Sequence, residues 1–182
     1  MSVTGAAEYR DASAREQCVL VDEQNNVVGA IARADMRRDN RMHRATYIFV
    51  FDEQRARIVV QRRTDWKDYC PGKLDACFGG VVAYGESYEE NARREIKEEI
   101  GLDDVALKHH FTGLYTDDTT NVWGDIWSAQ FTGDLSDLRL QPEEVASVQW
   151  VPVADHGTQA VSPDEFTPDS LHFLRLLLSS TT

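Results

Sequence analysis

The sequence has little cysteine and no long apolar run, and each shortage argues against a class of protein. Its three cysteines, Cys18, Cys70 and Cys77, are an odd number without a C-x-x-C pair, which argues against a disulfide framework or a zinc ribbon. The strongest apolar stretch, residues 171–178, is too short for a membrane span, and the opening residues lack the profile of a secretion signal. Reduced thiols and these absences predict a cytoplasmic protein.

Positive charge is also scarce, with 19 Lys and Arg against 31 Asp and Glu and a formal net charge of −12. Proteins that bind nucleic acid without sequence preference hold its phosphates with clustered cations, so no nucleic acid partner is expected. A phosphorylated ligand would have to be met by local cations or by a metal ion.

A chain of 182 residues can bury one substantial core, which predicts a single domain. Residues 1–15 are small and polar without periodicity, so we expect a disordered N-terminus followed by one domain over residues 16–180. The pattern predicts a hairpin, a loop over 34–44, a second hairpin, a long loop from 62 to 73 and a strand before a central helix. Expected strands cover 18–32 (two), 46–51, 57–61, 74–82, 111–115, 123–131 and 145–153, with helices over 87–100 and from 168. Strands on both sides of one helix favour a mixed sheet packed between helices, an α+β arrangement.

The informative segment is GGVVAYGESYEENARREIKEEIGL, residues 79–102. Ser87 with Glu90 forms a capping-box signature, which predicts that the helix starts at Ser87. Glu95, Glu98 and Glu99 follow at i, i+3 and i+4, so three carboxylates share one face beside an apolar stripe.

Such a cluster repels itself, and a divalent cation would turn that repulsion into attraction. Mg²⁺ suits an all-oxygen ligand set, with Mn²⁺ as an alternative, and Arg94 is placed to pair with Glu98 four residues later. Glutamate-rich helix faces are also common as plain solvated surface.

The order of these residues resembles the Nudix box, G-x5-E-x7-R-E-U-x-E-E-x-G-U, where U is a bulky aliphatic residue. Every defined position is filled, by Gly80, Glu86, Arg94, Glu95, Ile96, Glu98, Glu99, Gly101 and Leu102. The resemblance implies an α/β/α sandwich with a mixed sheet, and a pyrophosphohydrolase that cleaves a small-molecule substrate in which a nucleoside diphosphate is linked to a group X.

Carried over position by position, the resemblance makes the Gly80 carbonyl, Glu95, Glu98 and Glu99 the metal ligands. Arg94 would orient the carboxylates, whereas Glu86 and Gly101 fit structural roles. The general base stays open between Glu98 in the box and Glu143 or Glu144 in the later QPEEV segment, which is equally typical of a solvated turn.

The loop RRTDWKDYCPGK gathers four candidate ligands for substrate phosphates, Arg62, Arg63, Lys67 and Lys73. It also contains Trp66 and Tyr69, whose rings could stack on a base. A surface loop with extended cationic side chains is the plainer interpretation.

Flanking segments, including MHRATY and PGKLD, resemble the YfcD-like branch of the superfamily, close to type 1 isopentenyl diphosphate isomerase. The position of the isomerase's catalytic cysteine is Gly79 here, and two of its metal-binding histidines correspond to Val81 and Met36. His43 matches a third, and Cys77 lies two residues too early, which disfavours the isomerase. His43 also fits a structural role.

Two further questions stay open. A non-catalytic nucleotide-binding or regulatory module is an alternative to the enzyme, because fold membership does not fix function. Apolar edge strands and the resemblance favour a homodimer, while the group X cannot be read from the box.

Overall fold

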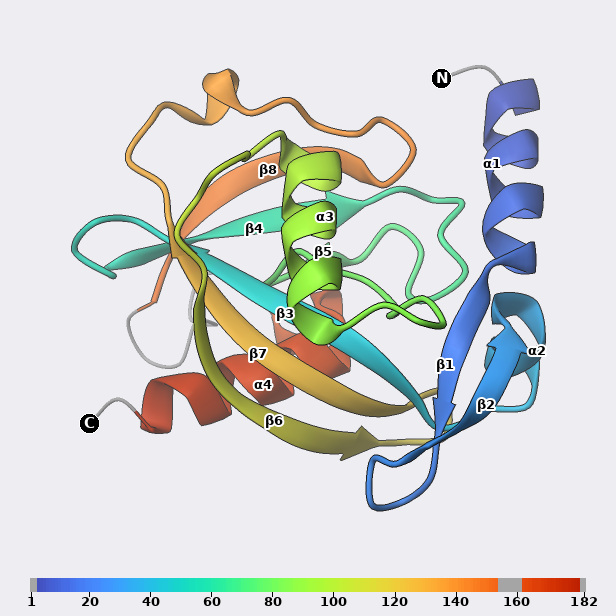
Figure 1. Ribbon diagram of the computed structural model, residues 1–182. Coiled ribbons are helices and arrows are strands. Elements are labelled where there is room, and N and C mark those ends of the chain that lie inside the picture. Colours follow the sequence, from blue (N-terminus) through green and yellow to red (C-terminus); the bar gives the residue numbers. More distant parts are fainter. Residues whose placement is uncertain (1–2, 154–161, 181–182) are drawn as a thin grey trace.

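A single mixed sheet of eight strands forms the centre of the computed structural model, which describes residues 3–153 and 162–180 (Figure 1). The strands are β1 (Gln17–Val21), β2 (Val27–Ala32), β3 (His43–Phe51), β4 (Arg57–Arg63), β5 (Leu74–Asp75), β6 (Lys108–Thr116), β7 (Asn121–Gln130) and β8 (Val145–Pro152). The helices are α1 (Val3–Arg15), α2 (Arg33–Arg38), α3 (Tyr88–Ile100) and α4 (Pro168–Ser179), with 3-10 turns η1 (Leu135–Asp137) and η2 (Pro163–Glu165).

Strand β3 is the hub of the sheet, and its pairing opens a space beside it. It runs parallel to β7 from His43 to Phe51, whereas the other strand pairs are antiparallel. Strands β3 and β4 share only the pair Phe51↔Ile58 next to their turn and then separate. The main chain of residues 78–82 follows β3 through antiparallel hydrogen bonds, so the loop before α3 lies in the gap between the two strands.

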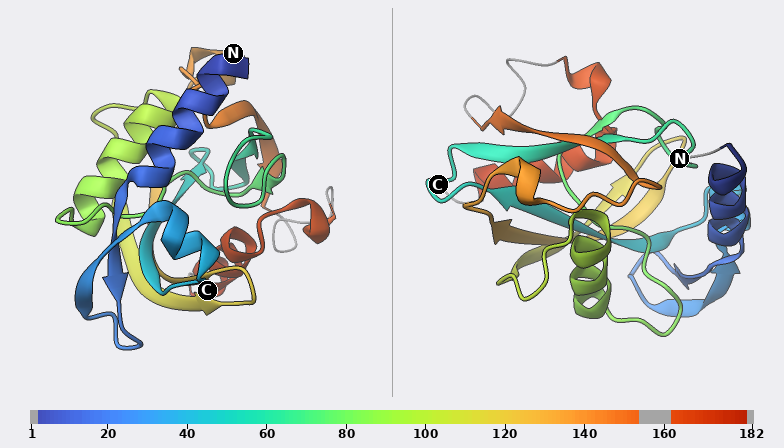
Figure 2. Two further views of the ribbon diagram at one scale, coloured as in Figure 1. Left: turned by 90° about the vertical axis from the view of Figure 1, so that its right-hand side faces the viewer. Right: turned by 90° about the horizontal axis from the view of Figure 1, so that it is seen from above.

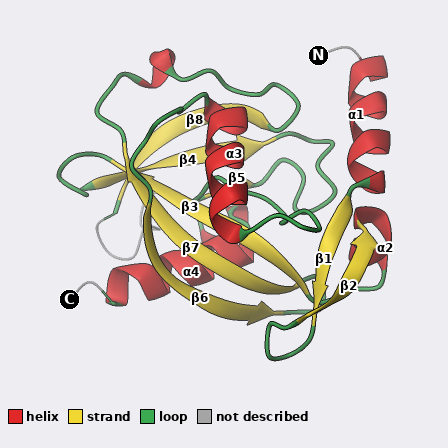
Figure 3. Cartoon of the chain, viewed as in Figure 1, coloured by secondary structure: helices red, strands yellow, loops and turns green. Residues whose placement is uncertain are grey.

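Helices α3 and α4 cover opposite faces of the sheet, as Figures 1 and 2 show from different sides. Successive residues of β3 point to opposite faces, so Ile48 packs in the cluster that contains Ile96 of α3, and Phe49 in the cluster that contains Phe173 of α4. All four side chains are at most 1% exposed. Figure 3 shows the resulting helix, sheet and helix layers, which confirm the predicted α/β/α sandwich with a mixed sheet.

Two segments differ from the prediction. Residues 3–15 form helix α1, so the expectation of a disordered N-terminus is wrong for that span. The helix is held by tertiary contacts, because it packs on α2 and the Tyr9 hydroxyl donates to Glu144. The expected loop at 34–44 contains the short helix α2, in which Met36 is 1% exposed. Neither segment has an amphipathic repeat long enough to be read locally.

The structure also bears on the membrane-span and cysteine predictions made from the sequence. Within residues 3–153 and 162–180, no helix is both long enough and apolar enough to cross a membrane. Cys18, Cys70 and Cys77 are free thiols, and the first and last of them are buried.

Candidate active site

Helix α3 begins and ends where local rules place its ends. The Ser87 hydroxyl accepts a hydrogen bond from the Glu90 amide at 3.2 Å, and the Glu90 carboxylate accepts one from the Ser87 amide at 2.8 Å. Gly101 ends the helix with φ of 73°, a conformation that favours glycine. The capping box therefore fixes where α3 begins, and its apolar residues Ala92, Ile96 and Ile100 pack against the sheet.

The three box glutamates occupy different environments on that face. Glu99 is 1% and Glu95 is 9% exposed, because both lie beside the buried apolar stripe of α3. The side chain of Glu98 is 49% exposed. Burial, with Glu144 and Glu95 nearby, raises the pKa of Glu99 well above its usual range, and burial raises the pKa of Glu95 to about 7 although Arg94 acts against it.

Arg94 connects the carboxylates of the box. Its guanidinium lies 2.9 Å from Glu86, 3.0 Å from Glu95 and 2.9 Å from Glu98. Glu86 in turn accepts hydrogen bonds from the Asn91 side chain at 2.9 Å and the Ala83 amide at 3.2 Å. One planar cation thus holds the loop before α3, the buried Glu95 and the half-exposed Glu98 in a fixed relation.

Two glycines let the loop approach the glutamates closely. A Cβ at Gly80 would lie 2.6 Å from a carboxylate oxygen of Glu95. Gly79 has φ of 127°, donates its amide to Glu99 at 2.9 Å, and would place a Cβ 2.2 Å from the carbonyl oxygen of Thr46. A side chain at either position would require the backbone or Glu95 to move.

The donor set suits a hard divalent cation in its chemistry. Buried Glu95 and Glu99 and half-exposed Glu98 offer carboxylate oxygens, and the Gly80 carbonyl accepts one hydrogen bond, from the Thr46 amide at 3.0 Å, which leaves a lone pair. Like charges buried together also favour a cation between them. Within the described part of the chain, no three acidic, histidine or cysteine side chains converge as a complete metal shell, since Glu98 is turned to Arg94.

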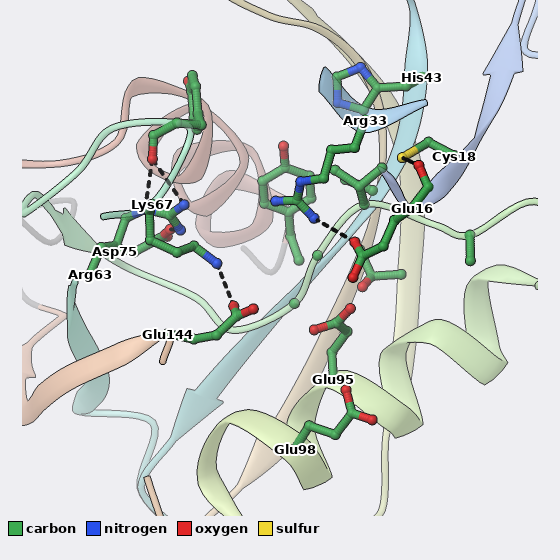
Figure 4. A pocket seen from close by; sticks show the side chains of 18 of the residues that line it. Glu16, Cys18, Arg33, His43, Arg63, Lys67, Asp75, Glu95, Glu98 and Glu144 are labelled. Atoms are coloured by element: carbon green, nitrogen blue, oxygen red, sulfur yellow. Dashed lines mark hydrogen bonds and ion pairs between the residues drawn. The ribbon is translucent and has the colours of Figure 1, made fainter. Parts of the chain in front are cut away.

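A cavity of about 340 Å³ lies beside this helix, where β3 and β4 separate. Glu95, Glu98 and Arg94 line it from α3, and Gly80 lines it from the loop before the helix. In Figure 4 the side chains of Glu95, Lys67 and Glu144 point into the same space. The volume is at the lower end of the range for small-molecule sites.

Glu144 faces the cavity, whereas Glu143 does not line it. The Glu144 carboxylate accepts hydrogen bonds from the Lys67 ammonium and the Tyr9 hydroxyl. Burial acts to raise the pKa of Glu144, but Lys67 and Tyr9 outweigh it and hold the pKa at about 2. Glu143 contributes its main-chain carbonyl, which accepts from the Thr64 hydroxyl at 3.0 Å and the Trp66 indole at 2.8 Å. The two adjacent acids therefore have different surroundings.

Two of the four predicted phosphate ligands line the cavity, and the other two do not. Lys67 and Arg63 line the cavity, and Arg63 is held by Asp75 at 2.9 Å and by the carbonyl of Tyr69. Arg62 is exposed and donates to the carbonyl of Gly72, and neither Arg62 nor Lys73 lines the cavity. Tyr69 lines this cavity, whereas Trp66 lines a second one of about 260 Å³ between α1, α2 and the 64–72 loop.

His43 and Cys77, the two residues of this chain that bear on the isomerase pattern, are buried in the cavity wall. His43 is 2% exposed, and its Nδ1 lies 2.9 Å from the Arg41 carbonyl. The Cys77 thiol lies 3.2 Å from Asp75, and burial with that carboxylate raises the pKa of the thiol well above its usual range. Both groups are therefore neutral at pH 7.

Several cavity residues were not singled out from the sequence. Arg33 and Arg37 come from α2, Tyr9 from α1 and Asp169 from α4. The spacing of Arg33 and Arg37 by four residues was a usable signal, because it places two cations on one helix face.

Comparisons with known proteins identify the family and the fold. A family model described as the NUDIX domain matches residues 41–177. An uncharacterized Nudix hydrolase of Yersinia pestis is 45% identical over 172 residues, covering 94% of this chain and 91% of the relative. Uncharacterized Nudix hydrolase YfcD of Escherichia coli K12 is 40% identical, covering 93% and 90%. A crystal structure of a Deinococcus radiodurans protein has a TM-score of 0.69 at 22% identity, covering 88% of this chain and 98% of that one.

Proposed function

This chain belongs to the Nudix family and is a pyrophosphohydrolase, and we propose that it cleaves a nucleoside-diphosphate-linked substrate by Mg²⁺-dependent attack of water on phosphorus. The observation that carries the proposal is the placement of Glu95, Glu98 and Arg94 on one wall of a cavity that Lys67 and Glu144 also line. Carboxylates for a cation, a cation for phosphate and a further carboxylate are the groups that this hydrolysis needs.

The box supplies the proposed metal ligands. Glu95, Glu98, Glu99 and the Gly80 carbonyl would hold the ion, and Mn²⁺ fits the same oxygen donors. When bound, a divalent cation neutralises phosphate oxygens and lowers the pKa of water. The role of Arg94 is to hold Glu95 and Glu98 in position through contacts of 3.0 and 2.9 Å.

Lys67 and Glu144 are the proposed phosphate ligand and proton acceptor. A substrate phosphate competes with Glu144 for the Lys67 ammonium, because both anions accept hydrogen bonds from the same group. When a bound substrate takes the Lys67 ammonium away from Glu144, the pKa of the Glu144 carboxylate rises and the carboxylate becomes a stronger base. We prefer Glu144 to Glu98 because Glu98 is paired with Arg94 and belongs to the proposed metal set.

The isomerase is not proposed, because position 79 cannot hold a cysteine in this backbone. The left-handed φ of Gly79 and the 2.2 Å approach of a Cβ to Thr46 exclude a side chain there without a shift of β3. The buried, neutral thiol of Cys77 does not replace it.

A cytoplasmic location and a homodimer stay predictions. Three free thiols suit a reducing compartment. Val27 and Val28 of strand β2 are 51% and 59% exposed, which offers apolar surface for a second copy.

The test is an assay of hydrolysis with Mg²⁺ on a panel of ADP-ribose, UDP-glucose, NAD and coenzyme A, in which the two phosphomonoester products are separated by ion-exchange chromatography, with Glu99→Gln as the variant. We expect its turnover to fall by at least about 100-fold, equivalent to about 2.7 kcal/mol, as for loss of a metal ligand. Glu89→Gln is the matched control, because Glu89 lies on the same helix with its side chain 57% exposed.

Turnover of Glu99→Gln close to that of the wild type would contradict the assignment of this residue. If the wild type hydrolyses no substrate of the panel, binding of the same substrates is measured by calorimetry. Tight binding of a panel member without product over hours would then favour a binding module over an enzyme.

A further inference from the structure

Helix α2 points two arginines into the cavity, one turn apart. Arg33 and Arg37 both line it, and because they are four positions apart in the helix, they are offset by about 6 Å along its axis. The Arg33 charge acts on Glu95 and Glu144, so Arg33 is the arginine nearer to α3. The side chains that act on the charge of Arg37 are Asp68 first, then Arg33, Tyr47 and Arg63, and the last two also line the cavity.

Arg33 is matched by carboxylates of the protein. Its guanidinium makes two hydrogen bonds to Asp68, at 2.7 and 3.2 Å, and lies 3.4 Å from Glu16. Figure 4 shows the contact with Glu16 at the cavity wall. This arginine has a counter-ion of its own.

Arg37 is poorly matched although its side chain is only 18% exposed. Its nearest carboxylate is the same Asp68, at 3.6 Å, which already binds Arg33 by both oxygens. The one hydrogen bond of its guanidinium in the described residues is a long one of 3.4 Å to the Thr120 hydroxyl, and its buried Nε, which makes the 3.6 Å contact with Asp68, has no hydrogen-bond partner. A buried cation without a hydrogen-bonded counter-ion is unfavourable, so this position favours an anion from outside the protein.

The groups around Arg37 suit such a ligand. The guanidinium carbon of Arg37 lies 5.0 Å from the centre of the Tyr69 ring, a cation–π contact. The Tyr69 hydroxyl, beside Cys70, is buried without a hydrogen bond of ordinary geometry. Two further acids line the cavity near Tyr69, but Asp75 is paired with Arg63 at 2.9 Å, and Asp169 accepts from Tyr47 at 2.8 Å. Neither carboxylate is available to Arg37.

We propose that Arg37, with Thr120 and the Tyr69 ring, forms a second anion subsite that binds a phosphate or carboxylate carried by the group X of the substrate. This inference rests on the proposed function, in which Lys67 and α3 meet the scissile diphosphate. It assigns the substrate class as diphosphates whose X group has a negative charge of its own.

The kinetic test uses substrate pairs that differ in the charge of the group X, namely nicotinic acid adenine dinucleotide and NAD, and UDP-glucuronate and UDP-glucose. We expect the wild type to prefer the charged member of at least one pair by about tenfold or more in kcat/KM. Arg37→Gln abolishes the preference chiefly by slowing the charged member, and Arg37→Lys, which keeps the charge without the planar fork, retains part of it.

The matched control is Arg38→Gln, because Arg38 lies on the same helix with its side chain 65% exposed and pairs with Asp35 and Asp39. It keeps the wild-type preference. If Arg37→Gln lowers kcat/KM equally for both members of every pair, the inference is overturned, and Arg37 instead contacts the scissile diphosphate. Absence of any preference in a wild type that hydrolyses the pairs would also overturn it.

A binding measurement separates this inference from the proposed function. Without metal, inorganic phosphate is expected to raise the thermal midpoint of the wild type and of Arg38→Gln, and to raise that of Arg37→Gln less. The same rise in all three proteins would refute the subsite. The phosphate-induced rise in thermal midpoint can be smaller in Arg37→Gln than in the wild type even if the wild type hydrolyses none of the substrate pairs. That combination would support the subsite and contradict the proposed hydrolysis.

Discussion

His43 makes the stability of this protein depend on pH in a calculable way. It lies 2% exposed on β3, and because the Arg41 carbonyl only accepts, the proton of the neutral ring is on Nδ1, 2.9 Å away. Burial, and then the charges of Arg37 and Arg33, lower the pKa of His43 to about 3. An unfolded histidine titrates near 6.5, so between these values the unfolded chain binds a proton that the folded protein does not.

The stabilising contribution of neutral His43 is therefore complete above about pH 6.5 and is lost as the pH falls toward 3. At pH 4.5 the loss from this group alone is about 2.7 kcal/mol, which is 1.36 kcal/mol for each pKa unit. His43→Asn keeps an N–H donor for the Arg41 carbonyl and does not titrate. We expect it to be less stable than the wild type at pH 7.5, because packing is lost, and to lose about 2.7 kcal/mol less between pH 7.5 and 4.5.

Urea unfolding followed by tryptophan fluorescence at the two pH values measures this difference. The control is the same substitution at His109, whose side chain is 45% exposed. If the wild type and His43→Asn lose equal free energy between pH 7.5 and 4.5, the assignment of His43 as a buried neutral group is refuted. A metal-binding or solvated role for His43 would then have to be considered again.

Two other substitutions test the site and the helix that carries it. Glu144→Gln should lower kcat by about 10²- to 10⁴-fold, the range for loss of a general base, whereas Glu143→Gln should stay within about twofold because Glu143 acts through its main chain; equal losses in steady-state kinetics would contradict the choice between them. Ser87→Ala removes the capping box of α3 and should lower the free energy of unfolding by about 1 kcal/mol in urea titration. An unchanged midpoint would show that the cap is not formed in solution.

The helix of the Nudix box was predictable because its signals are local. Ser87 and Glu90 cap each other, and Gly101 accepts the left-handed conformation that ends the helix. The helical spacing also predicts that Glu95 and Glu99 lie on one face of the helix, beside an apolar stripe. That Glu95 and Glu99 are buried while Glu98 is half exposed does not follow from spacing, because it depends on how α3 meets the sheet.

The opposite wall of the cavity was not predictable in the same way. Strand β3 finds its parallel partner β7 far along the chain, and its early separation from β4 creates the cavity. Arg37 reaches this space because the β1–β2 hairpin and α2 fold over it, and α1 adds Tyr9. Burial and non-local pairing decide these positions, and neither leaves a periodic signal in a six-residue helix.

The charge arrangement around α3 gives a physical reason for a cation in this site. Arg94 is shared among three carboxylates, and the Lys67 ammonium is taken by Glu144, so Glu95 and Glu99 are buried with too little positive charge beside them. Burial raises the pKa of both groups, and the neighbouring carboxylate of Glu144 raises it further. Like charges held together out of water are unfavourable in the protein alone, and the same low dielectric strengthens their attraction to a divalent ion. A helix face that is merely solvated would not bury two of its glutamates, so the burial of Glu95 and Glu99 favours a functional cluster over an ordinary acidic surface.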